Sequence, residues 1–190
     1  MSPQPSRRTD PLTVDTIVDA ATTLIADAGL PSFSMRRLGV ALGVDPMSVY
    51  HHVPGKRELL SLVTGRVVGA MALPAEDDPW DVRVRGWARA YWDVVVANRD
   101  LIAAGLADPV VAAGGVPLVA PLTEAVAESG INPELVEPNV WLVVDFVHGA
   151  ALGVAAPPRH ADDDLGPLLR AFDVGLDTVV AGIAARAAAQ

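Results

Sequence analysis

The spacing of apolar side chains is the feature that most constrains the fold of this 190-residue chain. Between residues 14 and 28 apolar residues recur every three or four positions, and the same spacing returns in several later segments. This period places the apolar side chains on one face of an α-helix. No segment alternates apolar and polar residues for long enough to predict a β-strand. The chain is therefore predicted to be all-α.

Capping residues predict where the first helices begin and end. Thr13 is expected to cap the first helix, with Thr16 at the position where a capping box commonly has an acid. Gly29 is expected to end that helix. Ser34 is a plausible N-cap for a second, short helix over residues 35–42, which a glycine ends.

A third very short helix is predicted over residues 47–52. Asp45 supplies its cap, and Pro46 follows at the first helical position, where its missing N–H costs nothing. A longer helix is expected from Lys56 to about Leu73. Its buried side is predicted to consist of seven apolar residues: Leu59, Leu60, Leu62, Val63, Val67, Val68 and Met71.

The remaining chain is also predicted to be helical. A break at PAEDDPW, near residues 74–79, closes the first unit. Later helices are expected at about 81–98, 100–107, 116–129, 138–155 and 165–188. The predicted organisation is a flexible arm over residues 1–12, a first domain over 13–73 and a second domain over 80–190.

Charge is distributed unevenly between the two predicted domains. The formal net charge is −9, but residues 1–65 hold six basic and six acidic side chains. The rest of the chain holds eight basic and 17 acidic side chains, so the negative excess lies after residue 65. A neutral front half with a local basic cluster and an acidic back half suggest two separate roles.

Composition excludes several classes of protein. The chain has no Cys, which rules out disulfides, thiolate metal sites and cysteine nucleophiles. We find no histidine pair with metal-ligand spacing and no phosphate-binding glycine loop, so neither a metal nor another cofactor is expected. No apolar run is long enough for a membrane span and no secretory signal is visible, so a cytoplasmic protein is expected.

A helix, a glycine-containing turn and a second short helix between Ser34 and His52 follow the helix-turn-helix plan. The segment SFSMRRLGVALGVDPMSVYHHVPGKRELL resembles the DNA-binding segment of the TetR family of bacterial repressors. The resemblance implies an N-terminal three-helix DNA-binding domain and a C-terminal helical domain for ligand binding and dimerisation. It extends over residues 13–70, and beyond them only through helix number and length.

The resemblance assigns five residues to DNA binding. It implies that Arg36 reaches a base edge, where a guanidinium can bond to guanine O6 and N7. It implies that Ser48, Tyr50 and His52 contact phosphates and bases, and that Lys56 holds a phosphate at a helix N-terminus.

Two glycine-containing positions depart from what the resemblance leads us to expect. Pro54-Gly55 replaces longer polar residues, which removes one backbone donor and puts a phosphate contact there in doubt. Gly39 lies inside the second helix, and close packing against the first helix is expected there.

The back half carries a candidate sensor site and a candidate dimer surface. The helix over 138–155 is apolar almost all round, so it is expected to pack on its own domain and on a partner, together with the last helix. A pocket is predicted from six residues: Trp87, Tyr91, Trp92, Trp141, Asp145 and His148. In the alternative interpretation, Asp145 and His148 simply bond to neighbours in the core.

The predicted function is a DNA-binding regulator, without enzymatic activity, that acts as a homodimer on double-stranded operator DNA. The resemblance favours a repressor released by a small-molecule effector that the sequence does not identify, and activation stays open. One alternative is a small helical ligand-binding protein or enzyme with a vestigial DNA-binding domain. Another is a scaffold that binds other proteins through its acidic back half.

Overall fold

The computed structural model describes residues 11–153 and 166–189, and every regular element in these ranges is a helix. This confirms the all-α prediction. The contacts divide the chain into two units, which are unit 1 (residues 1–69 and 100–116) and unit 2 (residues 70–99 and 117–190). The grouping differs from the sequence-based division at residues 73–80, because segment 100–116 packs with the first helices.

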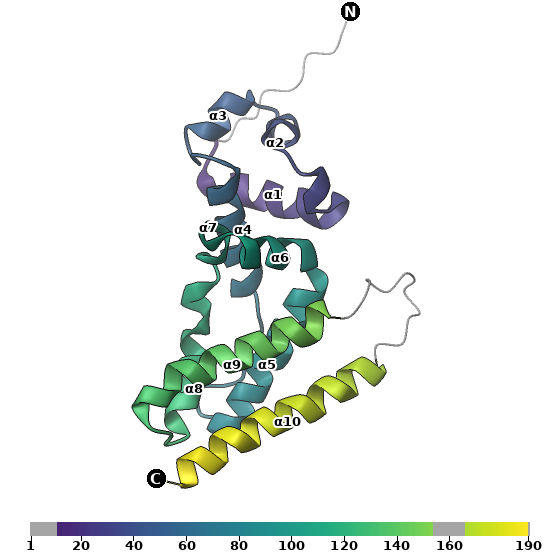
Figure 1. Cartoon of the computed structure of the whole chain (residues 1–190). Coiled ribbons are helices and arrows are strands. Elements are labelled where there is room, and N and C mark those ends of the chain that lie inside the picture. The colour runs from purple at the N-terminus through teal and green to yellow at the C-terminus, as the bar shows by residue number, and fades with distance from the viewer. Residues whose placement is uncertain (1–10, 154–165, 190) are drawn as a thin grey trace, which may run out of the picture. The chain divides into compact units, whose positions relative to one another are not determined.

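Unit 1 is built around a small helical core (Figure 1). Its helices are α1 (Val14–Ala28), η1 (Leu30–Ser32), α2 (Met35–Leu42), α3 (Pro46–Tyr50), α4 (Lys56–Gly69), α6 (Arg99–Ala107) and α7 (Pro109–Ala112). Ile17 of α1, Leu38 of α2 and Val49 of α3 are fully buried. Leu101 and Val111 join the same core, which explains why α6 and α7 belong to this unit.

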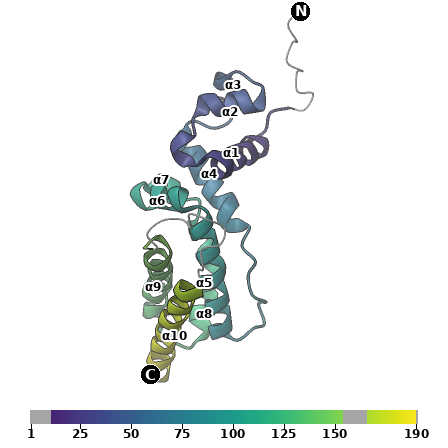
Figure 2. The same cartoon turned by 90° about the vertical axis from the view of Figure 1, so that its right-hand side faces the viewer.

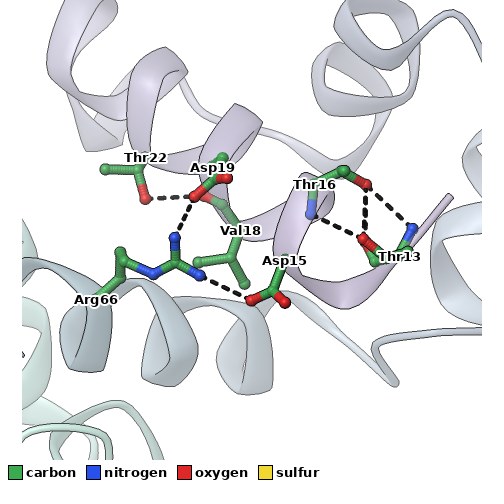
Figure 3. A network of polar contacts seen from close by, with 7 residues as sticks. All are labelled: Thr13, Asp15, Thr16, Val18, Asp19, Thr22 and Arg66. Carbon is green, nitrogen blue, oxygen red and sulfur yellow. Dashed lines mark hydrogen bonds and ion pairs between the residues drawn. The ribbon is translucent and has the colours of Figure 1, made fainter. Parts of the chain in front are cut away.

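The first helix begins and ends as its capping residues predict. Thr13 Oγ1 accepts from the Thr16 backbone N–H at 3.2 Å, and Thr16 Oγ1 accepts from the Thr13 N–H at 3.0 Å (Figure 3). Gly29 follows α1 at φ +74°, a conformation that favours glycine. Threonine therefore closes this capping box in place of an acid.

The fourth helix is tied to the first by one arginine. Arg66 of α4 forms ion pairs with Asp15, at 2.8 Å, and with Asp19 of α1 (Figure 3). All three side chains are exposed, so we expect this contact to fix the pairing of α1 and α4 more than to stabilise the fold.

Glycines allow α4 to approach the chain near α7 closely. A Cβ at Gly114 would lie 1.8 Å from the Ser61 carbonyl oxygen, and one at Gly65 would lie 3.1 Å from the Gly114 carbonyl oxygen. Only the absence of side chains permits this separation.

Several predicted boundaries in unit 1 need correction. The third helix covers Pro46–Tyr50, earlier than residues 47–52. The fourth ends at Gly69, four residues before Leu73. Leu73 is exposed, and the chain here belongs to unit 2, where Pro74 lies against Gly86.

Two predictions about buried positions in unit 1 were also wrong. Leu62 was predicted to be buried but is 42% exposed, because Leu59, Leu60 and Val63 occupy the core face of α4. Gly39 packs closely against Pro46 of α3, where an added Cβ would lie 3.0 Å from the proline ring, and not against the first helix.

Unit 2 consists of α5 (Trp80–Ala97), α8 (Ala120–Glu128), α9 (Pro133–Leu152) and α10 (Gly166–Ala188). Helix α5 packs against both α8 and α9, and α10 packs against α5 and α9 (Figure 2). Trp87, Val84 and Ala88 of α5 are buried at the centre of this packing.

A buried arginine fastens α5 to α8. Arg83 is 7% exposed, and its guanidinium lies 2.7 Å from Glu128 Oε2 and 3.7 Å from Glu124 Oε2. A buried arginine needs such partners, because an unpaired buried charge is costly.

Two helix boundaries in unit 2 differ from the prediction. The expected helix over 116–129 is split into η2 (Val116–Val119) and α8, because Pro121 occupies the first turn of α8. Helix α9 begins at Pro133, five residues before the expected start, because Asn132 caps it by accepting from the Glu134 N–H at 3.0 Å. Pro138 is accommodated inside the helix.

Helix α9 is long and apolar enough to cross a membrane, judged by length and composition alone. Core helices of soluble proteins commonly have such a composition. In unit 2, α9 packs against α5, α8 and α10, and Val140, Val143 and Val147 are buried there. Trp141 and Leu142 on the same helix are 40% and 49% exposed, so α9 retains an apolar face that the described residues of unit 2 do not cover.

Candidate functional site

The second and third helices form a helix-turn-helix with its connecting turn held by caps. Gly43 ends α2 at φ +68°, in the left-handed region. Asp45 Oδ1 then accepts from the Met47 N–H at 2.8 Å and starts α3. The contact between Gly39 and Pro46 fixes the separation of the two helices. The two short elements therefore form one rigid surface.

Three exposed side chains lie on the outward side of α3 and its C-cap, with Tyr50 and His51 one turn after Met47. Met47 is 63% exposed, Tyr50 is 41% exposed, and His51 is exposed directly after the helix. Val49 is fully buried and fixes which side of α3 faces the core. Ser48 is half-buried, so among the predicted DNA-binding residues of this helix Tyr50 presents the most accessible side chain.

The sequence-based prediction did not include Met47 in the recognition surface, because it considered only polar and aromatic side chains. The signal was present in the helical spacing, since position 47 precedes Tyr50 by three residues and shares its face.

Arg36 and His52 are both exposed, but they lie in different surroundings. Arg36 is on α2, one turn before the exposed Val40. His52 lies in the turn after α3 and lines a surface hollow of about 480 Å³ with Leu62 and Val110. The hollow lies within unit 1 and joins the end of the helix-turn-helix to α7.

Lys56 opens α4 and reaches back toward the segment before α2. Its Nζ donates to the Phe33 carbonyl oxygen at 3.2 Å and lies 5.6 Å from the centroid of the Phe33 ring. The side chain is exposed, and an ammonium has three donors, so this contact leaves donors for a phosphate. The phosphate role of Lys56 stays a prediction.

Arg57 forms a two-point contact with Asp108 inside unit 1. Its Nε lies 2.6 Å from Asp108 Oδ2, and its Nη2 lies 2.7 Å from Oδ1. Asp108 also caps α7 by accepting from the Val110 N–H at 3.0 Å. The hydrogen bond from Arg57 holds the pKa of Asp108 below its usual value. The same carboxylate thus joins the start of α4 to the start of α7.

Three rings meet in the interior of unit 2. Trp87 and Tyr91 of α5 have ring centroids 4.9 Å apart, and the Tyr91 and His148 rings are 5.4 Å apart. The Tyr91 hydroxyl lies 2.7 Å from His148 Nε2. We call Trp87, Tyr91 and His148 the ring cluster.

One polar atom of the ring cluster lacks a hydrogen-bond partner in the part of the chain that the structure describes. His148 Nδ1 is buried and makes no hydrogen bond within the residues that the structure describes. Burial lowers the pKa of His148, against the opposing effect of Asp145, and raises the pKa of Tyr91 to about 12. Both groups are therefore neutral near pH 7, and an uncharged hydrogen-bonding group of a ligand or a water can satisfy Nδ1.

The structure does not bring the other predicted pocket residues into the ring cluster. Trp92 packs on Phe172 of α10, with centroids 4.5 Å apart. Trp141 and Asp145 are exposed on α9. Although the three residues share one side of α9, His148 is the one nearest to the buried Val144 and Val147 around the helix.

The residues that the structure describes contain no group of three or more His, Asp or Glu placed to hold a metal ion.

Comparison with known proteins gives a family for this architecture. Residues 17–63, which include α2 and α3, match the model for bacterial regulatory proteins of the tetR family. The chain is 32% identical over 152 residues to the HTH-type transcriptional repressor DrrR1 of Streptomyces coeruleorubidus. That alignment covers 78% of this chain and 56% of the repressor, so the chain spans little more than half of this relative.

Solved structures resemble the chain over nearly its whole length. The TetR family protein ActR of Streptomyces coelicolor in complex with actinorhodin has a TM-score of 0.75 at 28% identity, covering 94% of this chain and 99% of ActR. BioQ with its natural double-stranded DNA operator has a TM-score of 0.74 at 26% identity, covering 92% and 99%. With its capped helix-turn-helix and its helical second unit, this chain belongs to the TetR family of bacterial regulatory proteins.

Proposed function

We propose that this chain is a transcriptional regulator that binds double-stranded operator DNA as a homodimer, represses transcription and releases DNA when a small molecule binds unit 2. The observation that carries this proposal is the exposed outer face of α3, which is held rigidly against α2 and presents Tyr50. A short exposed helix of this kind fits the major groove.

The five predicted contact residues divide into two roles in this proposal. Arg36 reads a base edge, because an exposed guanidinium can donate two parallel hydrogen bonds to guanine. Tyr50, Ser48 and His52 bind phosphates or bases around α3, and Lys56 holds a phosphate. Support comes from the similarity to BioQ, which was solved with its DNA operator.

Dimer formation is proposed at the apolar faces of α9 and α10. Beside Trp141 and Leu142 on α9, Val174 of α10 is 69% exposed and Leu168 is 39% exposed. These faces on two copies would form a four-helix interface around a two-fold axis. The two α3 helices would then enter major grooves about 34 Å apart on a two-fold symmetric operator.

The effector is proposed to bind at the ring cluster. Trp87 and Tyr91 supply aromatic surface, and His148 Nδ1, to which no described residue bonds, supplies one directional hydrogen bond. Ligand sites commonly combine a mostly apolar lining with a few placed polar groups. The similarity to ActR, which was solved with actinorhodin, supports a small-molecule effector for this chain.

The proposed signal path runs through segment 100–116. The chain leaves α5 of unit 2, forms α6 and α7 in unit 1, and returns to α8 of unit 2. Asp108 on this path holds Arg57 at the start of α4, one residue after Lys56. A change of α5 or α8 on effector binding would therefore move α4, with a coupling of about 1–3 kcal/mol between the two sites.

We also propose that the protein works in the cytoplasm and acts by binding alone, without catalysis. The decisive experiment is selection of bound fragments from random duplex DNA by the purified full chain, followed by titration of the enriched fragment. A two-fold symmetric sequence bound by one dimer is the expected result. If no fragment is enriched over random DNA at low salt, the regulator proposal is wrong.

A further inference from the structure

Met47 exposes a long apolar side chain at a position where the backbone is fixed. Its N–H donates to Asp45 Oδ1 at 2.8 Å, and its neighbour Pro46 packs against Gly39. Val49, two residues later, is fully buried. The helix is therefore unable to rotate Met47 inward, and the side chain stays 63% exposed.

The exposure of Met47 is not compensated by apolar neighbours on α3. The other exposed side chains on this face, Tyr50 and His51, both carry hydrogen-bonding groups. An apolar side chain that is exposed to water does not contribute to stability through burial. It contributes favourable free energy to binding if another apolar group covers it in the complex.

The major groove offers one apolar group on its base edges. Guanine, adenine and cytosine present hydrogen-bond donors and acceptors there, whereas thymine adds a C5-methyl group. A methionine placed against a donor or acceptor would leave that group without a partner, which is costly. A thymine methyl is the partner that matches the thioether chain of Met47.

We propose that Met47 is a specificity-determining residue that packs against the C5-methyl group of one thymine in each half of the operator. This inference rests on the proposed DNA-binding function and deepens it, because it names a base that the protein selects by apolar contact. Arg36 does not supply this selection, since a guanidinium recognises bases through hydrogen bonds.

The test replaces thymine by uracil, which removes the methyl group and keeps every hydrogen-bonding group. Each thymine of the selected operator is replaced in turn, symmetrically in both half-sites, and affinity is measured at one fixed salt concentration. For the wild-type chain, one replacement is expected to weaken binding about fourfold per methyl group, or about fifteenfold for both half-sites. In Met47→Ala that replacement is expected to have almost no effect.

Three further variants separate this contact from a loss of folding. Met47→Leu keeps an apolar side chain and should retain the dependence on the methyl group, whereas Met47→Gln should lose it. Leu106→Ala, which truncates a similarly exposed residue on α6 of unit 1, should keep both affinity and methyl dependence.

Three outcomes count against the inference, and they are distinguishable. If Met47→Ala keeps the full dependence on every thymine methyl, or if the wild-type chain responds to no replacement, Met47 does not read thymine. If the wild-type chain binds no duplex at all, the proposed function falls and this inference falls with it.

Discussion

Arg57 and Asp108 lie 51 positions apart in the chain and join helices α4 and α7 through two hydrogen bonds of 2.6 and 2.7 Å. Arg57 follows the first residue of α4, and Asp108 caps α7. Because the guanidinium contacts both carboxylate oxygens, the pair fixes orientation as well as distance. Helix α7 is thereby fixed relative to the start of α4, next to the recognition surface.

Removing the arginine should loosen α7. In Arg57→Ala, Asp108 keeps its bond to the Val110 N–H but loses its fixed orientation, so amide exchange in residues 110–113 is expected to accelerate. Hydrogen exchange measured by mass spectrometry checks this. Arg66→Ala is the matched control, because it removes another bridging arginine of α4 but leaves α7 alone. Equal exchange in α7 of all three proteins would contradict the assigned role.

The same pair should respond to acid. Since Arg57 lowers the pKa of Asp108, the contact stabilises the fold above the ordinary pKa of an aspartate and is lost as pH falls through the lowered value. Weaker protection of the α7 amides, after correction for the intrinsic pH dependence of exchange, is therefore expected only below about pH 4 in the wild-type chain.

Arg36 and Lys56 should weaken DNA binding in different ways. Arg36→Ala is expected to cost about 1–3 kcal/mol on the selected operator and to relax preference at one base pair, whereas Lys56→Ala should weaken all sequences and reduce the salt slope by about 1. Titrations at several salt concentrations measure both effects.

Arg37→Ala is the matched control for Arg36, because it removes the same charge from the next residue of α2. The Arg37 guanidinium already donates to the Ser32 carbonyl oxygen at 2.8 Å, so a smaller effect on DNA affinity is expected. If the two variants lose equal affinity and keep equal base preference, Arg36 does not read a base.

Local signals in the sequence predicted much of unit 1. Thr13, Ser34 and Gly43 mark helix ends by side-chain capping or by a left-handed backbone, and both effects depend on near neighbours only. The all-helical fold followed from periodicity in the same way. Helix ends near prolines were predicted less accurately, because a proline does not by itself show where a helix begins. Pro121 lies in the first turn of α8, whereas Pro138 lies inside α9.

Contacts between distant segments were beyond the sequence-based prediction. Nothing near Asp108 indicates that it meets Arg57, and the membership of α6 and α7 in unit 1 depends on the burial of Leu101 and Val111. The ring cluster was partly predicted, since Trp87, Tyr91 and His148 do meet. Trp92 was assigned to the same pocket, but Phe172 of α10 is its actual neighbour.

His148 should make unit 2 sensitive to mild acid. Because burial lowers its pKa in the folded chain, the unfolded chain takes up a proton first as pH falls below about 6.5. The free energy of unfolding is therefore expected to be highest above this pH and to decrease as pH falls from 7 to 5. Urea unfolding across this range measures the decrease.

The contribution of His148 is isolated by comparison with His148→Gln, which keeps a side chain capable of hydrogen bonding but does not titrate. The variant should show a smaller decrease between pH 7 and pH 5, because it lacks the imidazole whose pKa is lowered by burial. Parallel pH profiles for the two proteins would show that His148 is not the group responsible.

Arg83 should contribute to the stability of unit 2. Arg83→Ala is expected to lower the free energy of unfolding by about 1–3 kcal/mol, because it removes the charged hydrogen bond to Glu128 and the packing of a buried stem. Urea unfolding at neutral pH measures the loss. Glu124→Gln, whose carboxylate is exposed and lies 3.7 Å away, should change stability by less than about 0.5 kcal/mol.

If Arg83→Ala and the wild-type chain unfold at the same urea concentration, Arg83 does not contribute to the stability of unit 2. Arg83→Met separates charge from packing, since it keeps most of the apolar stem. An intermediate loss is expected for this variant.

Val174 should be required for dimer formation without being required for folding. It is 69% exposed on α10, so Val174→Glu places a charge in solvent in the single chain and leaves the core of unit 2 intact. In the proposed dimer the same charge would be buried without a partner, which is expected to weaken association at least about tenfold. Light scattering during size-exclusion chromatography measures the mass over a range of concentrations. Leu106→Glu, a similar change on α6 of unit 1, should remain dimeric. If Val174→Glu is as fully dimeric as the wild-type chain at the lowest concentration, the two chains associate through another surface, because an uncompensated carboxylate would not be tolerated between α10 helices.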